Sequence, residues 1–185
     1  MTSTAEPEPE LDAGAFSTWL ASMTAALRGE GDADVPCDGC TACCTASQFV
    51  TIGPDETDTV AHIPKALLFP APGRPGHVVL GYDERGHCPL LVEGACSIYE
   101  HRPRACRTYD CRVFRAAGVA IDEPGKRHLA HRVEQWRFRY AGPDDRRRHD
   151  AVQAAARHLR DRARNATEVA VLAVEHHEEY LDAAG

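Results

Sequence analysis

The chain has 185 residues, of which 43% are hydrophobic and 26% charged. This is enough for one compact domain with helical extensions. No apolar run approaches the ~20 residues of a membrane-spanning helix, which excludes an integral membrane protein. The net charge of -7 arises mainly in residues 1–35, which carry seven acidic residues and one arginine. The remainder is close to neutral and gives no general electrostatic reason to expect nucleic acid as a partner.

The N-terminal residues are predicted to form two segments. Residues 1–10 are rich in proline and glutamate, which indicates a disordered acidic leader. They lack the basic and apolar stretches of a secretory signal, so we expect a cytoplasmic protein. Phe16, Leu20, Met23 and Leu27 then recur at helical spacing. This pattern predicts a helix over residues 11–28, within a segment of helix and linker that extends to residue 35.

A cysteine-rich module is expected over residues 36–115. After the CDGCTACC segment, the sequence predicts a short strand at residues 49–52, a short helix at 55–62 and a loop at 70–76. Strands at residues 78–82, 87–92 and 96–99 would form a small meander. A helical turn is predicted from Pro103 to Arg112.

The C-terminal extension, residues 116–185, is expected to be helical and to pack on the module. Helices are predicted at residues 127–140, 150–164 and 167–181, and the last two carry apolar residues on one face. The predicted fold class is therefore α+β. It consists of a small metal-bound cysteine module with a short β meander, flanked by an N-terminal helix and C-terminal helices.

All eight cysteines lie between residues 37 and 111. Cytosolic thiols are kept reduced, so metal ligation explains the cluster better than disulfides do. Two-residue spacing lets a tight turn aim several sulfurs at one centre. The adjacent cysteines at 43 and 44 should differ in role, because neighbouring side chains diverge. The predicted ligands are Cys37, Cys40, Cys43, Cys44, Cys88, Cys96, Cys106 and Cys111.

The four downstream cysteines must be brought together by the fold. A three-residue hairpin loop would set Val92 opposite Cys96 and leave Cys88 about 13 Å away, whereas two sulfurs on one zinc lie about 4 Å apart. Either the hairpin is irregular, or these two cysteines do not share an ion. On one helix Cys106 and Cys111 would point in different directions, so Cys111 is expected beyond the helix end.

Eight thiols fit two four-ligand sites, or one site with spare thiols. The frequency of four-cysteine zinc sites in cytosolic proteins supports zinc. The spacing of the cysteines supports a 4Fe-4S iron-sulfur cluster equally well. Cys-x2-Cys-x2-Cys begins a ferredoxin ligand run, whose last cysteine precedes proline as Cys88 does. Arginines near the downstream cysteines could donate to metal-bound sulfur or form a solvated surface. They are Arg102, Arg104, Arg107, Arg112 and Arg115.

Three segments together resemble a known family. They are CDGCTACC, CPLL at residues 88–91, and CSIYEHRPRACRTYDC at residues 96–111. They resemble the CxxCxxCC family of zinc- or iron-chelating domains, the YkgJ-type cysteine cluster proteins. The resemblance covers about residues 36–115 with all eight cysteines and implies metal binding. A flagellin lysine methylase looks like a larger relative with a similar cluster.

Two functions are compatible with these features. The first is a noncatalytic cytoplasmic metalloprotein with a structural, sensing or partner-binding role, in which the C-terminal helices contact a protein partner. The alternative is an iron-sulfur-dependent protein-modifying enzyme resembling flagellin lysine methylase, with Tyr99, Glu100 and Asp110 as candidate polar groups. No nucleophile-base pair or phosphate loop supports an enzyme, so we favour the first.

Two further roles have less support in the sequence. His87 and His101 lie near predicted ligands and could replace a thiolate, but a surface or capping role is favoured for each. Nucleic-acid binding would depend on one basic stretch. That stretch contains Lys126, Arg127, Arg132, Arg137 and Arg139.

Overall fold

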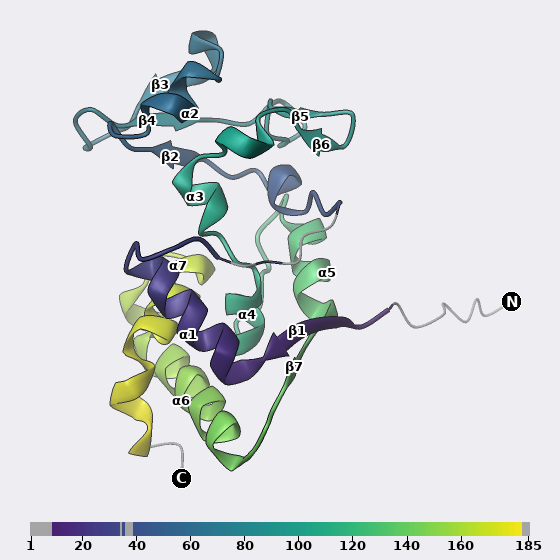
Figure 1. Cartoon of the computed structure of the whole chain (residues 1–185), viewed down its shortest axis with the longest axis vertical. Coiled ribbons are helices and arrows are strands. Elements are labelled where there is room, and N and C mark those ends of the chain that lie inside the picture. The colour runs from purple at the N-terminus through teal and green to yellow at the C-terminus, as the bar shows by residue number, and fades with distance from the viewer. Residues whose placement is uncertain (1–8, 34, 36–38, 183–185) are drawn as a thin grey trace, which may run out of the picture. The chain divides into compact units, whose positions relative to one another are not determined.

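The computed structural model describes residues 9–33, 35 and 39–182 and shows an α+β fold (Figure 1). The chain divides into two compact units, each built from separate stretches. The helical unit comprises Met1–Thr24, Cys111–Ala120 and His131–Gly185. The cysteine unit comprises Ala25–Asp110 and Ile121–Ala130. The predicted acidic leader falls mainly on residues 1–8, outside the described residues.

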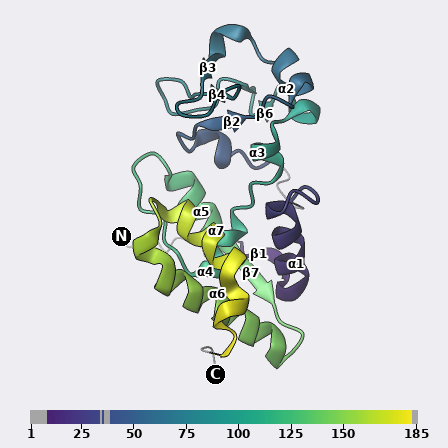
Figure 2. The ribbon, with the colours of Figure 1, turned by 90° about the vertical axis from the view of Figure 1, so that its left-hand side faces the viewer.

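The helical unit combines packed helices with one parallel pair of strands. Helices α6 and α7 lie side by side and both pack against α4 (Figure 2). Strand β1 pairs with β7, with Leu11 opposite Trp136. The elements are β1 (Leu11–Ala15), α1 (Phe16–Leu27), α4 (Arg112–Ala117), β7 (Trp136–Arg139), α6 (Pro143–Leu159), η4 (Arg160–Arg162), α7 (Ala166–His176) and η5 (His177–Tyr180).

Pairing of β1 with β7 changes two predicted helices. The N-terminal helix begins at Phe16 instead of residue 11, because Leu11–Ala15 is a strand in which Gly14 has a φ of +89°. The predicted helix over residues 127–140 ends at Gln135, since the next four residues form β7. Both predictions were wrong at these ends because a long-range pairing overrides local helical periodicity.

The C-terminal helices are confirmed as elements, with shifted ends. Helix α6 begins at Pro143 instead of residue 150. Proline at the first helical position lacks only an N–H that has no partner within the helix, and Asp144 and Asp145 favour the positive end of the helix dipole. Asn165 caps α7 by accepting a hydrogen bond from the Glu168 N–H at 3.0 Å.

The cysteine unit contains two small sheets. In the first, β4 lies between β2 and β3 and is antiparallel to both. The second is the hairpin of β5 and β6. Helix α5 (Arg127–Gln135) begins in this unit and ends in the helical unit. The other elements are η1 (Cys43–Thr45), β2 (Val50–Ile52), α2 (Thr57–Ala61), η2 (Lys65–Leu67), β3 (Leu68–Pro70), β4 (Val78–Leu80), β5 (Leu91–Val92), β6 (Ala95–Cys96), η3 (Tyr99–His101) and α3 (Arg104–Arg107).

The predicted meander from residue 78 to 99 is wrong. Strand β4 pairs with β2 and β3, and the β5–β6 hairpin forms a separate sheet. Strand β3 was not predicted, because its Pro70 adjoins a proline- and glycine-rich loop that resembles a turn in sequence. The strand at residues 49–52 and the helix at residues 55–62 are confirmed, with slightly shorter bounds.

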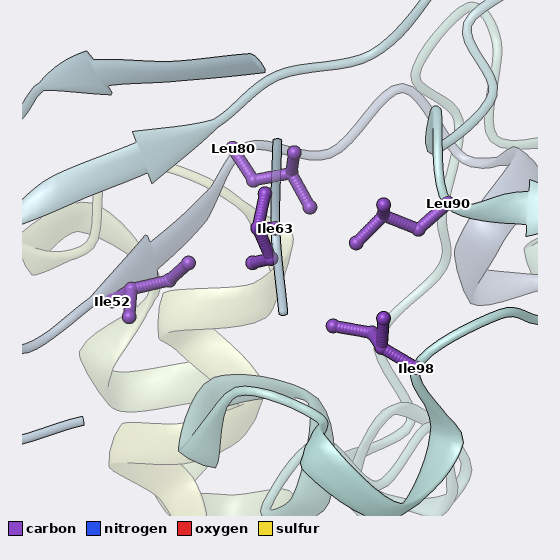
Figure 3. Close-up of a cluster of buried hydrophobic side chains, with 5 residues drawn as sticks. All are labelled: Ile52, Ile63, Leu80, Leu90 and Ile98. Carbon is purple, nitrogen blue, oxygen red and sulfur yellow. The ribbon is translucent and has the colours of Figure 1, made fainter. Parts of the chain in front are cut away.

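A small buried cluster holds the cysteine unit together. Figure 3 shows five aliphatic side chains that converge on one another from different elements. Cys88 and Cys96 are partly buried against this cluster, so the core also positions two thiols. The five side chains are Ile52, Ile63, Leu80, Leu90 and Ile98. Across the described part of the chain, no helix is both long and apolar enough to cross a membrane.

Candidate metal centre

Four segments of the cysteine unit bring four thiols close enough for the charge of one thiolate to affect another thiol. Cys44 lies in η1, Cys88 precedes the β5–β6 hairpin, Cys96 ends β6 and Cys106 lies in α3. The Cys88 N–H donates to the main-chain oxygen of Cys44 at 2.7 Å, which joins the first two segments directly. Burial is the main cause that raises the pKa of Cys106, and negative charge on Cys44, Cys88 or Cys96 raises it further, so the four thiols lie near one another.

A two-residue turn shapes the hairpin between Cys88 and Cys96. Its residues, Glu93 and Gly94, have φ values of 49° and 79°, as a type I′ turn requires. Leu91 therefore faces Cys96, which corrects the three-residue loop that would have placed Val92 there. The Leu91 N–H also donates to the Cys88 carbonyl at 3.0 Å. This second turn ends the strand early and makes the hairpin irregular.

The backbone around Cys88 is arranged as it would be around a thiolate ligand. Burial raises the pKa of the Cys88 thiol, and nearby Cys96 and Asp83 raise it further. The main-chain N–H groups of Leu90 and Leu91 hydrogen-bond to the sulfur and oppose this effect. N–H groups directed at sulfur stabilise its anionic form, which is the form that binds metals.

Cys106 combines surface access with a crowded thiol. The residue as a whole is exposed, so solvent reaches it. Surrounding protein atoms nevertheless desolvate the thiol and, together with the other three cysteines, raise its pKa to about 12. Arg102 acts in the opposite direction. Because repulsion among thiolates opposes deprotonation, a bound cation would offset this penalty.

Cys40 and Cys43 precede Cys44, and Cys37 lies outside the described residues. Cys43 and Cys44 are consecutive in a 3₁₀ turn, so their side chains diverge by about 120°. No disulfide joins any of the seven described cysteines to another. Among the described residues, no three cysteine sulfurs lie within 4.8 Å of one another. The thiols are therefore gathered but more widely spaced than around one bound ion.

Cys111 lies in the helical unit, where it caps α4. It is only 5% exposed, and its sulfur accepts a hydrogen bond from the Trp136 indole N–H at 3.2 Å. Helix α3 ends at Arg107, which confirms that Cys111 lies beyond the helix that carries Cys106. The role of Cys111 as a ligand stays a prediction.

Several of the arginines near the thiols contact oxygen atoms. Arg104 forms an ion pair with Asp55 at 2.6 Å, and Arg107 forms one with Asp32 at 3.2 Å. Arg112 donates to the main-chain oxygen of Ala13 inside the helical unit. These contacts account for three of the five predicted arginines as structural groups, whereas Arg102 influences the Cys106 thiol electrostatically.

The candidate histidines and polar groups occupy different surroundings. The main-chain N–H of His87 donates to the Asp83 carboxylate at 2.8 Å, whereas the ring Nδ1 of His101 lies against the Asp58 carboxylate. Tyr99 is 58% exposed and carries the Arg102 guanidinium over its ring, but Asp110 is buried. Solvent therefore reaches the Tyr99 ring but hardly reaches the Asp110 side chain.

Much of the basic stretch is neutralised by nearby carboxylates. Arg137 and Arg139 pair with Glu10 and Asp12 at 2.9 and 3.1 Å. Lys126 pairs with Glu123 at 2.5 Å. Paired cations bind phosphates less readily, because the carboxylate must first be displaced.

Residues 36–123 match a family model described as "CxxCxxCC: Putative zinc- or iron-chelating domain". The matched segment contains the cysteine-rich sequence from CDGCTACC to Cys111. No curated protein and no solved structure matches the chain.

Proposed function

We propose that the chain binds zinc or an iron-sulfur cluster through the thiolates of its cysteine unit, and the match of residues 36–123 to a zinc- or iron-chelating domain supports this. The primary ligands in this proposal come from the four segments described above. Cys37, Cys40 and Cys43 remain predicted ligands of the same or a second centre, and Cys111, in the helical unit, remains a ligand predicted from the sequence alone. The primary ligands are Cys44, Cys88, Cys96 and Cys106.

The convergence of these four cysteines carries the proposal. Free thiols in an ordinary core have no reason to gather from four segments, and their mutual repulsion as thiolates costs free energy unless a cation compensates it. Two N–H donors already face the Cys88 sulfur. An all-sulfur donor set selects zinc or iron-sulfur clusters over magnesium or calcium.

We propose a structural role for the metal, in the cytoplasm, where thiols stay reduced. The buried aliphatic cluster of this unit has five residues. A structural metal contributes on the order of 10 kcal/mol of binding free energy that also counts toward folding. By joining four segments, the centre would stabilise a unit whose apolar core is small.

Anaerobic purification followed by metal analysis, sulfide assay and absorption spectroscopy tests the proposal. A colourless protein with near-stoichiometric zinc identifies a zinc centre. A brown protein with iron and acid-labile sulfide identifies an iron-sulfur centre. Fully reduced protein that retains neither metal, and takes up neither on anaerobic reconstitution, would contradict the proposal.

A further inference from the structure

A second group of metal-ligating side chains lies on the surface of the cysteine unit. Asp58, His62 and His101 each place a ligating atom within 4.8 Å of the other two. His101 Nδ1 lies 2.8 Å from Asp58 Oδ2, and His62 Nδ1 lies 3.8 Å from Asp58 Oδ1. The two imidazole rings stack with centroids 3.5 Å apart and an interplanar angle of 6°.

The backbone positions of this trio are fixed by the buried aliphatic cluster. Asp58 lies in the first turn of α2, and His62 caps the end of that helix. Ile63 follows directly, and its side chain belongs to the cluster. The main-chain N–H of His101 donates at 2.8 Å to the carbonyl of Ile98, another cluster member (Figure 3). Two histidines from distant parts of the sequence are thus held together before any ion binds.

The chemistry of the trio differs from that of the thiol centre. Two imidazoles and one carboxylate suit first-row divalent ions such as Zn²⁺, Ni²⁺ and Cu²⁺. Aspartate is ionised at neutral pH and compensates part of the ion's charge. Three protein ligands leave at least one coordination position for water or another ligand. We propose that Asp58, His62 and His101 form a second metal site, which binds a divalent first-row ion independently of the cysteines.

Ion binding would rearrange the side chains and leave the backbone in place. The nitrogen lone pair of an imidazole lies in the plane of its ring, and the two stacked ring planes are nearly parallel. At least one ring must therefore turn before both can bind the same ion. The side chains have room to do so, because Asp58, His62 and His101 are 72, 41 and 38% exposed. The ion would replace the hydrogen bond between His101 and the Asp58 carboxylate and end the ring stacking. Binding through His62 Nδ1 would also replace its 2.9 Å hydrogen bond to the main-chain oxygen of Asp58.

Titration with Ni²⁺ tests this site. The sample is the full-length protein as it is isolated, with the cysteine-bound metal already in place. Calorimetry should detect one further Ni²⁺ per chain. His62→Ala, His101→Ala and the isosteric Asp58→Asn should each weaken this binding about tenfold or more, since even supporting residues around a metal contribute 10–100-fold. His158→Ala is the matched control, because His158 is exposed and its ring lies against that of Tyr180, with centroids 5.5 Å apart.

Paramagnetic Ni²⁺ also gives a direct readout of which histidines bind it. The ring signals of His62 and His101 should broaden at substoichiometric Ni²⁺ while that of His158 stays sharp. The content of cysteine-bound metal should be the same in all variants. The proposal is overturned if the wild-type protein takes up no further Ni²⁺, or if the three variants bind it as tightly as the wild type does.

Discussion

His149 is a half-buried titratable side chain in the helical unit. Its ring packs on Phe16 with centroids 4.6 Å apart, and its Nδ1 lies 2.7 Å from the Tyr140 hydroxyl. Burial is the main cause that lowers the pKa of His149, and the positive charges of Arg115 and Arg146 lower it further. A hydrogen bond to the Ala116 backbone and the charge of Asp150 oppose these effects. The folded protein therefore favours neutral imidazole.

We predict that this histidine makes the helical unit less stable in mild acid. An unfolded histidine has a pKa of about 6.5, so below that pH the unfolded chain binds a proton that the folded chain resists. The contribution is present above pH 6.5 and is lost as the pH falls toward the lowered pKa of the folded state. Urea unfolding at pH 5.5 and 7.5 measures this difference, with tryptophan fluorescence as the signal.

The His149→Gln variant should have a smaller pH dependence than the wild type. His158→Gln, which changes an exposed histidine of the same unit, should behave like the wild type. An unchanged pH dependence in His149→Gln would show that another group is responsible.

At the residue scale, local spacing predicted the site only in part. The CDGCTACC segment makes its cysteines candidate ligands, because a single turn could direct them at one centre. The proximity of Cys88 and Cys96 was not predicted, since it depends on a turn at Cys88 that shortens the strand. Asp58 and His62 have helical i, i+4 spacing that is visible in the sequence, but their partner His101 is 39 residues beyond His62 and joins them only through core packing.

At the element scale, the β5–β6 hairpin positions the thiols most directly. It contains only four paired residues, and its turn has a non-glycine residue, Glu93, at positive φ. The sequence signal at this turn was a single glycine, which is compatible with loops of two or three residues. The pairing of β1 with β7 had no local signal, because it joins segments about 125 residues apart. Long-range pairings of this kind explain most of the misplaced helix ends.

We predict that Gly94→Ala destabilises the hairpin and lowers metal affinity. The added Cβ would meet no atom within 4 Å, so the cost comes from the φ of +79°. An alanine in this conformation costs about 1 kcal/mol. Gly31→Ala is the matched control, since Gly31 also has open space around it but no positive φ. Competition with a chelator measures the affinity, and equal values for the two variants would contradict the role of the hairpin.

At the scale of the whole molecule, the two units have separate cores and separate spectroscopic signals. Both tryptophans, Trp19 and Trp136, lie in the helical unit. Tyr82, Tyr99 and Tyr109 lie in the cysteine unit. The sequence predicted an α+β fold correctly, but it did not show that Cys111 and the C-terminal helices share a unit with residues 11–24. Composition and periodicity identify elements, and they carry no information about which distant stretches pack together.

We predict that metal removal melts the cysteine unit and leaves the helical unit folded. Under reducing conditions, a strong chelator should collapse the amide chemical-shift dispersion of residues 39–110. Tryptophan fluorescence and the amide signals of α6 and α7 should change little, because their apolar core contains Phe114, Val152 and Val174. A fully demetallated protein that keeps the dispersed signals of the cysteine unit would exclude a structural role for the metal.

The metal content of single cysteine variants tests the central claim most directly. Cys96→Ser and Cys106→Ser should lose metal as severely as Cys44→Ser, because each removes a thiolate from a centre that joins several segments. Thr108→Ser is the control, since serine can keep the 2.9 Å hydrogen bond to the Arg104 carbonyl. All variants are purified anaerobically in parallel, and metal per chain is measured. Wild-type occupancy in both Cys96→Ser and Cys106→Ser, with loss only in Cys44→Ser, would contradict a centre built from both halves of the cysteine unit.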